Sequence, residues 1–371
     1  MRGVPARVKA LPLALALPLA LALALAATVL AGPGQDQASA ANRTTSPSWN
    51  LKLAIRYFPS AGNHSQYDTV LALGRTAWFF GGSNFSGHGV PEVEQRSGGK
   101  WHQSVLPSGL RTWITGASAI SPDDIWAATY LGGTVLSWNG SKWVREPGGR
   151  WNDNARFTGI VAFSPKNVWL FGSKSRGSAG AGTWHRSGTT WTEVRGAAAG
   201  IYKASAVSAT DMWAIGEAKG TVSALLRYRG TTWSRVTPAA LAGFTYSYVL
   251  ALGASSVWVA GSVDGTPELG HYDGRGWTAS TMPSSTPASG MCRDGRGGLW
   301  AVANSGLGPS SVYDRSAGGK WTAVPVYRSS ANEVLSCALV PGTTAAWGAG
   351  KSSVDVQNGS AAAAYGYGNV P

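Results

Sequence analysis

Short runs in which apolar and polar residues alternate recur along most of the chain. Examples are "TVLSWN" at residues 134–139 and "ALLRYR" at residues 224–229. Alternation with a period of two predicts strands that bury one face, and Asn139-Gly140 and Asp273-Gly274 predict tight hairpin turns. A helical spacing of apolar residues is sustained nowhere, so the pattern predicts an all-β protein.

Two series of tryptophans mark an internal repeat. The first series lies in short apolar runs such as "DMWAIG" at residues 211–216, with spacings of 42 to 48 residues: Trp78, Trp126, Trp169, Trp213, Trp258, Trp300 and Trp347. The second series lies three positions after a glycine, as in "GSKW" at residues 140–143: Trp101, Trp143, Trp191, Trp233, Trp277 and Trp321. A period of about 45 residues lies in the range of four-stranded propeller blades.

Each repeat divides into four strands, a to d. Strand a is a short apolar run such as "GIVAFS" at residues 159–164, strand b carries the first tryptophan, strand c precedes the glycine turn, and strand d begins at the second tryptophan. The first series has one member more than the second, and Trp49 in "WNLKLAI" supplies the missing strand d. The sequence therefore predicts a seven-bladed β-propeller of four-stranded antiparallel blades, over about residues 46–360, with its ring closed by the N-terminal strand near Trp49.

The repeated "W-A-x-G" strands and "N-G-x-x-W" or "D-G-x-x-W" turns resemble those of a broad group of bacterial β-propellers. The group includes kelch-like, tectonin-like and Asp-box repeat proteins. Its motifs imply an architecture and no particular activity. The chain departs from the Asp-box pattern, which has an aspartate two residues before the glycine, because Asn139 directly precedes Gly140 in "LSWNGSKW". A sialidase is therefore not implied.

The N-terminal segment predicts export. Arg2, Arg7 and Lys9 precede an apolar run at residues 11–31, and Ala38-Ser39-Ala40 matches the Ala-x-Ala cleavage pattern. We expect residues 1–40 to be a cleaved signal peptide and residues 41–371 to be a single propeller domain of a secreted, extracellular protein. The apolar run is long enough to span a bilayer, so an uncleaved signal anchor is the alternative. No later apolar stretch is long enough to span a membrane.

Aromatic and basic residues gather in the connections from strand d to the next strand a. In propellers these connections share one face with the b-to-c loops, around the mouth of the central channel. The ligand-binding candidates on this crossover face are Arg111, Trp113, Arg150, Trp151, Arg156, Tyr202, Lys203, Tyr246, Tyr248 and Arg328. Two interpretations stay open. The rings cover the ends of the blade cores, or rings and cationic groups bind a sugar face and a carboxylate or phosphate.

The charge of the chain favours anionic partners. The net charge is +13, and about +11 remains without the signal segment. Such an excess attracts cell-wall polymers, acidic glycans or membrane surfaces, although a merely solvated basic surface is the alternative. No helix-turn-helix, zinc-finger or RNA-recognition pattern is present, so we expect no specific nucleic-acid binding.

Arrangements typical of catalytic sites are sparse. The five histidines stand apart, without the His-x-x-x-His spacing of metal ligands, and no Gly-x-Ser-x-Gly or phosphate-binding loop occurs. We therefore expect neither a metal nor a cofactor. A propeller can still assemble an active site from several blades, and loss of polysaccharide turnover on changing Asp153 or Glu333 would support that. His64 and Glu333 lie in candidate crossover-face segments, and nothing in the sequence pairs them.

The two cysteines, Cys292 and Cys337, fall on strand a of consecutive blades. Innermost strands of adjacent blades lie close together, and an exported protein meets an oxidising environment, so we expect a disulfide. Two buried free thiols are the alternative.

The sequence thus favours a secreted, monomeric, non-enzymatic binding or scaffold propeller. Its partner would be a glycan, an anionic cell-envelope polymer or an extracellular protein, bound at the crossover face. The second hypothesis is a propeller glycosidase or lyase that acts on a polysaccharide.

Overall fold

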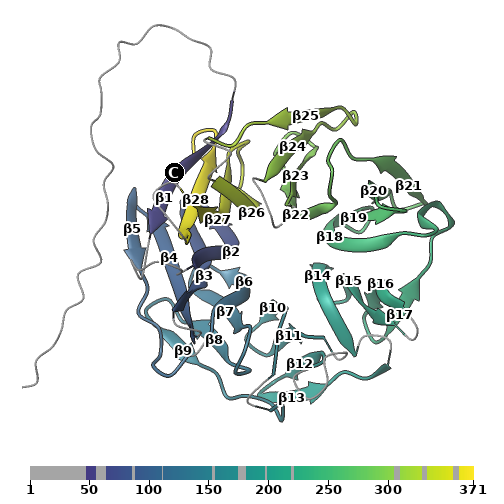
Figure 1. The fold of residues 1–371 in the computed structure, drawn as a ribbon. Coiled ribbons are helices and arrows are strands. Elements are labelled where there is room, and N and C mark those ends of the chain that lie inside the picture. The colour runs from purple at the N-terminus through teal and green to yellow at the C-terminus, as the bar shows by residue number, and fades with distance from the viewer. Residues whose placement is uncertain are drawn as a thin grey trace, which may run out of the picture. The chain divides into compact units, whose positions relative to one another are not determined.

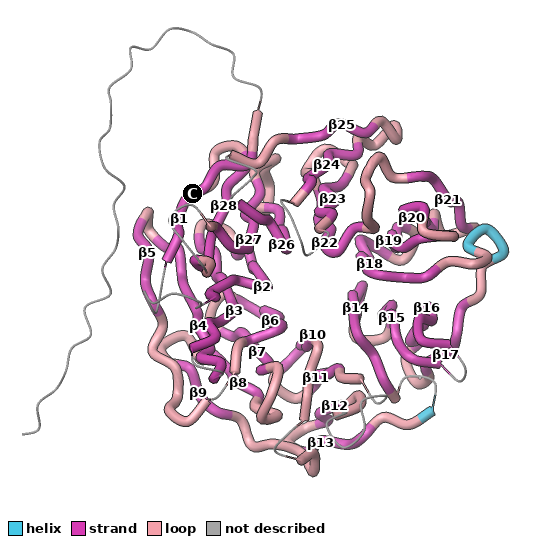
Figure 2. Tube along the Cα trace, in the orientation of Figure 1, coloured by secondary structure: helices cyan, strands magenta, loops and turns pink. Residues whose placement is uncertain are grey.

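Seven four-stranded sheets are arranged in a ring (Figure 1). Their innermost strands line the cavities at the two ends of a central channel. The computed structural model describes residues 47–55, 64–85, 88–110, 112–152, 155–173, 181–196, 199–218, 221–304, 310–327, 332–353 and 359–371. These residues belong to one compact unit, Gln37–Pro371. Most described residues lie in strands, and helical residues in the described ranges are limited to short turns such as η3 (Ala239–Leu241) (Figure 2). The fold is the predicted seven-bladed β-propeller.

The blades follow the chain, and each sheet begins with an innermost strand a beside the channel (Figure 1). Blade 1 comprises β2 (His64–Leu73), β3 (Thr76–Phe85), β4 (His88–Ser97) and β5 (Lys100–Gln103). Blade 2 comprises β6 (Ile114–Ser121), β7 (Asp124–Thr129), β8 (Val135–Trp138) and β9 (Trp143–Arg145). Blade 3 comprises β10 (Gly159–Ser164), β11 (Asn167–Phe171), β12 (Trp184–Ser187) and β13 (Thr190–Glu193).

The remaining blades repeat this order. Blade 4 comprises β14 (Gly200–Ser208), β15 (Asp211–Ala218), β16 (Thr221–Arg229) and β17 (Trp233–Val236). Blade 5 comprises β18 (Thr245–Gly253), β19 (Ser256–Val263), β20 (Thr266–Tyr272) and β21 (Trp277–Thr281). Blade 6 comprises β22 (Ala288–Arg293), β23 (Leu299–Ala303), β24 (Ser311–Arg315) and β25 (Trp321–Val324). Blade 7 comprises β26 (Asn332–Leu339), β27 (Ala346–Ser352), β28 (Ala361–Tyr367) and β1 (Trp49–Ile55).

The ring closes as predicted, through the N-terminal strand. β1 pairs antiparallel with β28, with Trp49 opposite Tyr367. Trp49 is fully buried, and its ring meets Trp300 of blade 6 edge-on at 5.3 Å. The predicted end of the ring near residue 360 is wrong, because β28 continues to Tyr367. Every residue of β28 is buried, whereas the other strands c end in residues that are at least partly exposed.

The first-series tryptophans lie on strand b of every blade and the second series on strand d, as predicted. Side chains of strand c pack on the first series across the blade boundaries. In blade 4 the Arg227 guanidinium of the same sheet lies 4.6 Å from the centre of the Trp213 ring. The centre of the Tyr272 ring of blade 5 lies 5.8 Å from the centre of the same Trp213 ring. In blade 2 the Trp126 ring has Arg186 of blade 3 at 4.9 Å. Such contacts make the repeated tryptophan the joint between neighbouring blades.

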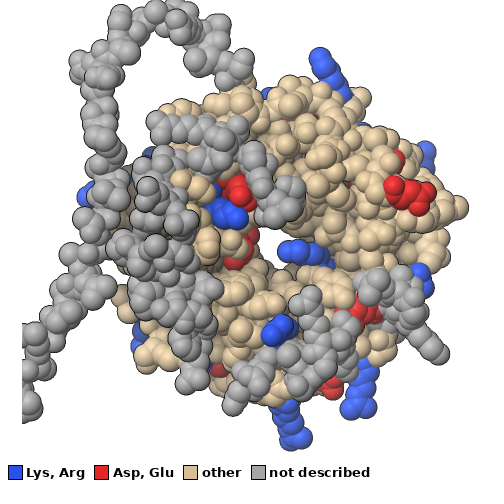
Figure 3. Space-filling view, in the orientation of Figure 1, with Lys and Arg blue, Asp and Glu red and all other residues tan. Residues whose placement is uncertain are grey.

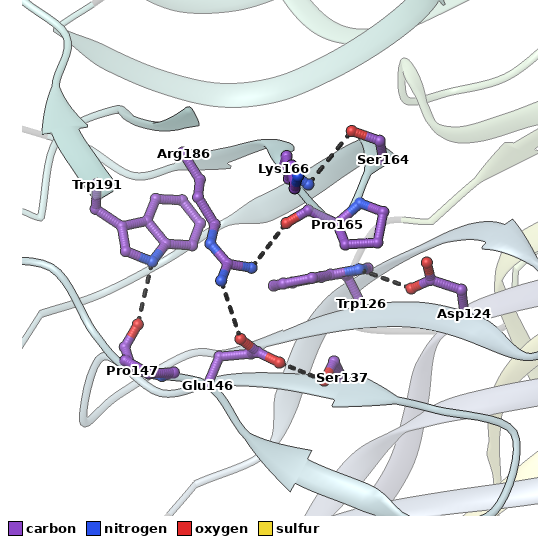
Figure 4. A network of polar contacts seen from close by, with 10 residues as sticks. All are labelled: Asp124, Trp126, Ser137, Glu146, Pro147, Ser164, Pro165, Lys166, Arg186 and Trp191. Carbon is purple, nitrogen blue, oxygen red and sulfur yellow. Dashed lines mark hydrogen bonds and ion pairs between the residues drawn. The ribbon is translucent and has the colours of Figure 1, made fainter. Parts of the chain in front are cut away.

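The Arg186 side chain extends this joint between blades 2 and 3 (Figure 4). It donates a hydrogen bond to the Pro165 carbonyl oxygen at 2.9 Å and lies 3.4 Å from a carboxylate oxygen of Glu146. The Trp126 indole N–H donates to Asp124 at 2.9 Å. Asp124 is therefore a structural residue of the turn, in agreement with its position after Pro122.

A β-bulge near the start of strand a recurs around the channel. Near the start of β2, β6, β14, β18, β22 and β26 one residue has no partner on strand b. With the equivalent residue of blade 3, these bulge positions are Asp68, Thr115, Thr158, Tyr202, Ser247, Ser289 and Leu335. The hydroxyls tie adjacent blades: Thr115 donates to the Phe157 carbonyl oxygen at 3.1 Å and Thr158 to that of Ile201 at 2.9 Å. The bulges thus face neighbouring blades and the channel mouth.

Cys292 and Cys337 form a disulfide that joins β22 of blade 6 to β26 of blade 7, with their Cα atoms 5.7 Å apart. Neither cysteine is free, so the alternative of two thiols does not describe this structure. The crosslink lies beside the closing blade. Among the described residues no helix is long and apolar enough to cross a membrane.

Candidate functional site

The channel opens on the crossover face into a cavity of about 660 Å³. It lies at the bulged ends of the innermost strands, and each of the seven blades contributes to its wall. Basic and acidic atoms lie next to each other at this central opening (Figure 3). The polar and aromatic lining residues are Gln66, Asp68, Thr69, Thr115, Tyr130, Thr158, Tyr202, Lys203, Tyr248, Ser289, Asn304, Glu333, Ser336 and Lys351.

Asp68 occupies the bulge of blade 1. Its Oδ1 accepts a hydrogen bond from Gln66 at 2.6 Å, whereas its Oδ2 is buried without a hydrogen-bond partner among the described residues. Burial raises the pKa of Asp68 from 3.8 to about 6, while the Gln66 hydrogen bond and the charges of Lys203 and Lys351 oppose this rise. The Asp68 carboxyl therefore changes between its protonated and ionised forms near pH 6.

Lys203 lies next to the bulge of blade 4 and extends into the cavity. Its ammonium group is 5.9 Å from the centre of the Tyr248 ring. Desolvation by the surrounding protein lowers the pKa of Lys203, and the Asp68 charge opposes this, although the channel leaves the side chain accessible to water. No carboxylate within the described ranges lies at ion-pair distance from it. Lys203 is thus a cation with room for an anionic group of a ligand.

Glu333 and Lys351 face each other across strands a and b of blade 7. The Lys351 ammonium lies 3.4 Å from Glu333 Oε2, and the Asn304 amide of blade 6 donates to the same oxygen at 3.0 Å. The partners of Glu333 in the structure are thus Lys351 and Asn304, which the sequence analysis did not consider. The pair is only partly buried and remains in contact with the cavity.

Three of the predicted ligand-binding residues line the cavity: Tyr202, Lys203 and Tyr248. The Tyr202 hydroxyl donates to Glu217 at 2.5 Å, which fixes its ring at the rim. Burial raises the pKa of Tyr248, so its hydroxyl stays protonated at neutral pH. Both tyrosines line the same cavity as Lys203.

Two further candidates support the cavity wall from behind. The ring of Trp113 stacks on Tyr130 at 5.1 Å with an angle of 10° between the planes, and the Arg156 guanidinium lies 5.6 Å from the centre of the Tyr130 ring. Tyr130 itself lines the cavity. Trp113 and Arg156 therefore hold a lining aromatic in place.

The structure places the other described candidates elsewhere. The Trp151 indole N–H donates to the Gly133 carbonyl oxygen at 2.7 Å, and its ring packs edge-on against Trp184 at 5.2 Å. Trp151 thus covers the core of blade 3, and exposed Arg150 lies with it in a separate hollow of about 610 Å³. Tyr246 packs on Phe244 in blade 5. For Trp151 and Tyr246 the core-covering interpretation fits these contacts. Arg111, Asp153 and Arg328 lie outside the described residues.

Sequence reasoning missed Asp68, Gln66, Asn304 and Lys351. The signal for Asp68 lies in the comparison of the repeats, since the equivalent positions hold hydroxyl residues in blades 2, 3, 5 and 6. Lys351 was detectable as the strand b partner of Glu333. Within the described ranges no three histidine, cysteine or carboxylate side chains are grouped as metal ligands.

Comparison with known proteins places this architecture among solved propellers. No protein-family model and no curated protein matches the chain. Similar solved structures include YCF48 bound to a D1 peptide, with 11% identity and a TM-score of 0.58 over 84% of this chain and 98% of that chain. Virginiamycin B lyase from Staphylococcus aureus with quinupristin has 12% identity and a TM-score of 0.60 over 86% and 100%.

A third similar structure is the extracellular domain of BT4673 from B. thetaiotaomicron. It has 14% identity and a TM-score of 0.56 over 85% of this chain and 40% of that chain. These likenesses show the propeller fold. At such low identities they assign neither a ligand nor an activity.

Proposed function

We propose that this protein is a secreted, non-enzymatic binding module that holds an acidic glycan in the cavity of the crossover face. Residues 1–40 direct export and are removed, which leaves one propeller domain, and the intact mass of the exported protein tests this. The observation that supports binding most directly is Lys203. It is an accessible cation without an ion-pair partner in the described chain, inside a cavity of about 660 Å³.

The composition of the cavity supports a ligand with one carboxylate and several hydroxyls. Lys203 binds the carboxylate, and the Tyr202 and Tyr248 rings offer surfaces for a sugar ring. Asp68 and Glu333 accept hydrogen bonds from sugar hydroxyls, and their negative charge disfavours a densely charged polyanion. A uronate-containing glycan therefore fits better than a polyphosphate.

Related architecture supports the use of such a ring for binding. The solved structures similar in fold include one with a D1 peptide and one with quinupristin. A propeller ring can thus carry a ligand. The choice of a glycan for this protein rests on its own cavity residues.

Titration calorimetry with galacturonate oligomers and their carboxyl-reduced galactose counterparts tests the proposal. We expect Lys203→Met to weaken binding of the acidic oligomer at least about tenfold and to leave the neutral one little changed. Arg150→Met, which removes an exposed cation outside the cavity, is the matched control and should bind like the wild type. Equal losses in both variants, or no saturable binding by the wild type, would refute an acidic-glycan site.

A second candidate function, a polysaccharide lyase, is favoured by one observation. Asp68 has a pKa of about 6, and Lys203, whose pKa is lowered, is its electrostatic neighbour. In β-elimination from a uronate, Asp68 would take the C5 proton, the electron pair would form the C4–C5 double bond, and the C4–O bond would break. Lys203 would give a proton to the leaving oxygen.

The lyase candidate makes its own prediction. The unsaturated product absorbs ultraviolet light, so turnover of polygalacturonate is visible directly. Turnover that disappears in Asp68→Asn while binding persists would establish the lyase. Absence of ultraviolet absorption with a bound oligomer would leave the binding module alone.

A further inference from the structure

The face opposite the cavity is built from the tight a-to-b and c-to-d turns, and it is rich in exposed cations. Arg75 and Lys166 lie in a-to-b turns, and Lys142 and Arg275 in c-to-d turns. We define the turn face by the exposed cations of these turns and their flanking strand ends that form no ion pair among the described residues: Arg75, Lys100, Lys142, Lys166, Arg229, Arg275, Arg293 and Lys320. Blades 1 to 6 each contribute at least one of them.

Few carboxylates offset this charge. Asp123 and Asp273 are the exposed acidic side chains in the same described turns. Asp211 is neutralised by Arg227, with both carboxylate oxygens at 2.9 Å. Asp294 and Asp314 share Arg296, which lies 3.5 Å from the first and 2.6 Å from the second. The eight cations therefore leave a positive excess on the turn face that is not cancelled by neighbouring acids.

The centre of the turn face is apolar. There the channel ends in a hollow of about 490 Å³, lined mainly by alkyl side chains and Phe163. Its serines already have partners, because Ser118 accepts a hydrogen bond from the Ala162 N–H at 3.0 Å and Ser205 one from the Ala251 N–H at 2.9 Å. Covering this hollow would leave neither serine without a hydrogen bond.

We propose that the turn face docks onto an anionic lipid bilayer. The turns end the seven sheets at one side of the ring, so the cations are spread around a circle and can approach a planar surface together. Proteins that bind a linear polyanion usually have a groove with cations in a row and exposed aromatic rings. The turn face does not fit this description, because large hydrophobic side chains exposed on the described surface are limited to Val105 and Tyr327. Each cation near an anionic bilayer strengthens binding about fivefold.

This docking is independent of the ligand cavity, because it uses the opposite end of the channel. It would direct the crossover face away from the membrane. Ligand binding and membrane binding therefore fail or succeed separately.

Vesicle sedimentation of the exported protein tests the docking. The vesicles contain phosphatidylcholine alone or with one third phosphatidylglycerol, at low and at high salt. The test variant carries four turn-face substitutions: Arg75→Gln, Lys142→Gln, Arg275→Gln and Lys320→Gln. The matched control removes the same charge elsewhere: Lys52→Gln, Arg150→Gln, Arg195→Gln and Arg235→Gln. All eight side chains are exposed, so both variants should keep the thermal stability of the wild type.

We expect the wild type to bind only the phosphatidylglycerol vesicles and to be released by high salt. The turn-face variant should bind about 600-fold more weakly, from four cations at about fivefold each, and the control should stay within a few-fold of the wild type. Failure of the wild type to bind, or equal losses in both variants, would overturn the proposal. So would turn-face-dependent binding of a soluble polyphosphate without any binding of vesicles, since it would identify a polymer as the partner.

Discussion

Replacing Asp68 by Asn should stabilise the protein at neutral pH and have little effect at pH 4. In the unfolded chain this carboxyl ionises near 3.8, whereas in the folded state it keeps its proton until about pH 6. Folding therefore becomes less favourable as the pH rises through this window and changes little above it. Each unit of difference between the folded and unfolded pKa corresponds to about 1.4 kcal/mol, so the full change in the free energy of unfolding is about 3 kcal/mol. Because water in the channel screens the carboxyl, we expect a change closer to about 1 kcal/mol.

Urea unfolding of the wild type and Asp68→Asn between pH 4 and pH 8 measures this difference. Asn is close in shape to the protonated acid and can still accept the Gln66 hydrogen bond, so the two proteins should match at pH 4. Relative to the wild type, the free energy of unfolding of the variant should rise between pH 4 and pH 6, and the difference should persist above pH 6. Lys203→Met should move the wild-type transition to higher pH, because it removes a charge that favours the carboxylate. A difference that is the same at every pH, or a less stable variant at pH 7, would refute this reasoning.

Two further predictions concern the blade joints. Cys292→Ala with Cys337→Ala should lower the free energy of unfolding by about 4 kcal/mol, from the entropy of a loop of 45 residues, and reductant should then have no additional effect on urea unfolding. Arg227→Met should cost about 2 kcal/mol because it leaves Asp211 unpaired and removes the cation above Trp213, whereas Arg229→Met, at an exposed neighbouring site, should cost almost nothing.

The fold was predictable because its signal is repeated in every blade. Each joint needs one large ring on strand b, so Trp213 and its six equivalents occur at nearly equal spacing. The predicted C-terminal end of the ring was wrong because β28 does not carry this repeated signal. β28 is buried on both faces between β27 and β1, and its alanines carry neither alternation nor a tryptophan.

The site was less predictable because side-chain direction depends on register. The bulge at Asp68 decides that this carboxyl enters the cavity, and a single sequence does not state where a bulge occurs. Trp151 illustrates the role of local packing. Its position in a crossover suggested a binding surface, yet its indole N–H is bound by Gly133 and its ring meets Trp184. Composition drew attention to the crossover face, and the structure shows which of its residues line the cavity.

The closing pair of strands has a consequence for biosynthesis. β1 is among the first parts of the propeller to be made and β28 the last, so blade 7 waits for the end of the chain. Pairing across such a separation is slow compared with the local hairpins of the other blades. Blade 7 also carries Glu333 and Lys351, so the cavity is completed in the same late step. A chain whose ring has not yet closed therefore has no finished cavity.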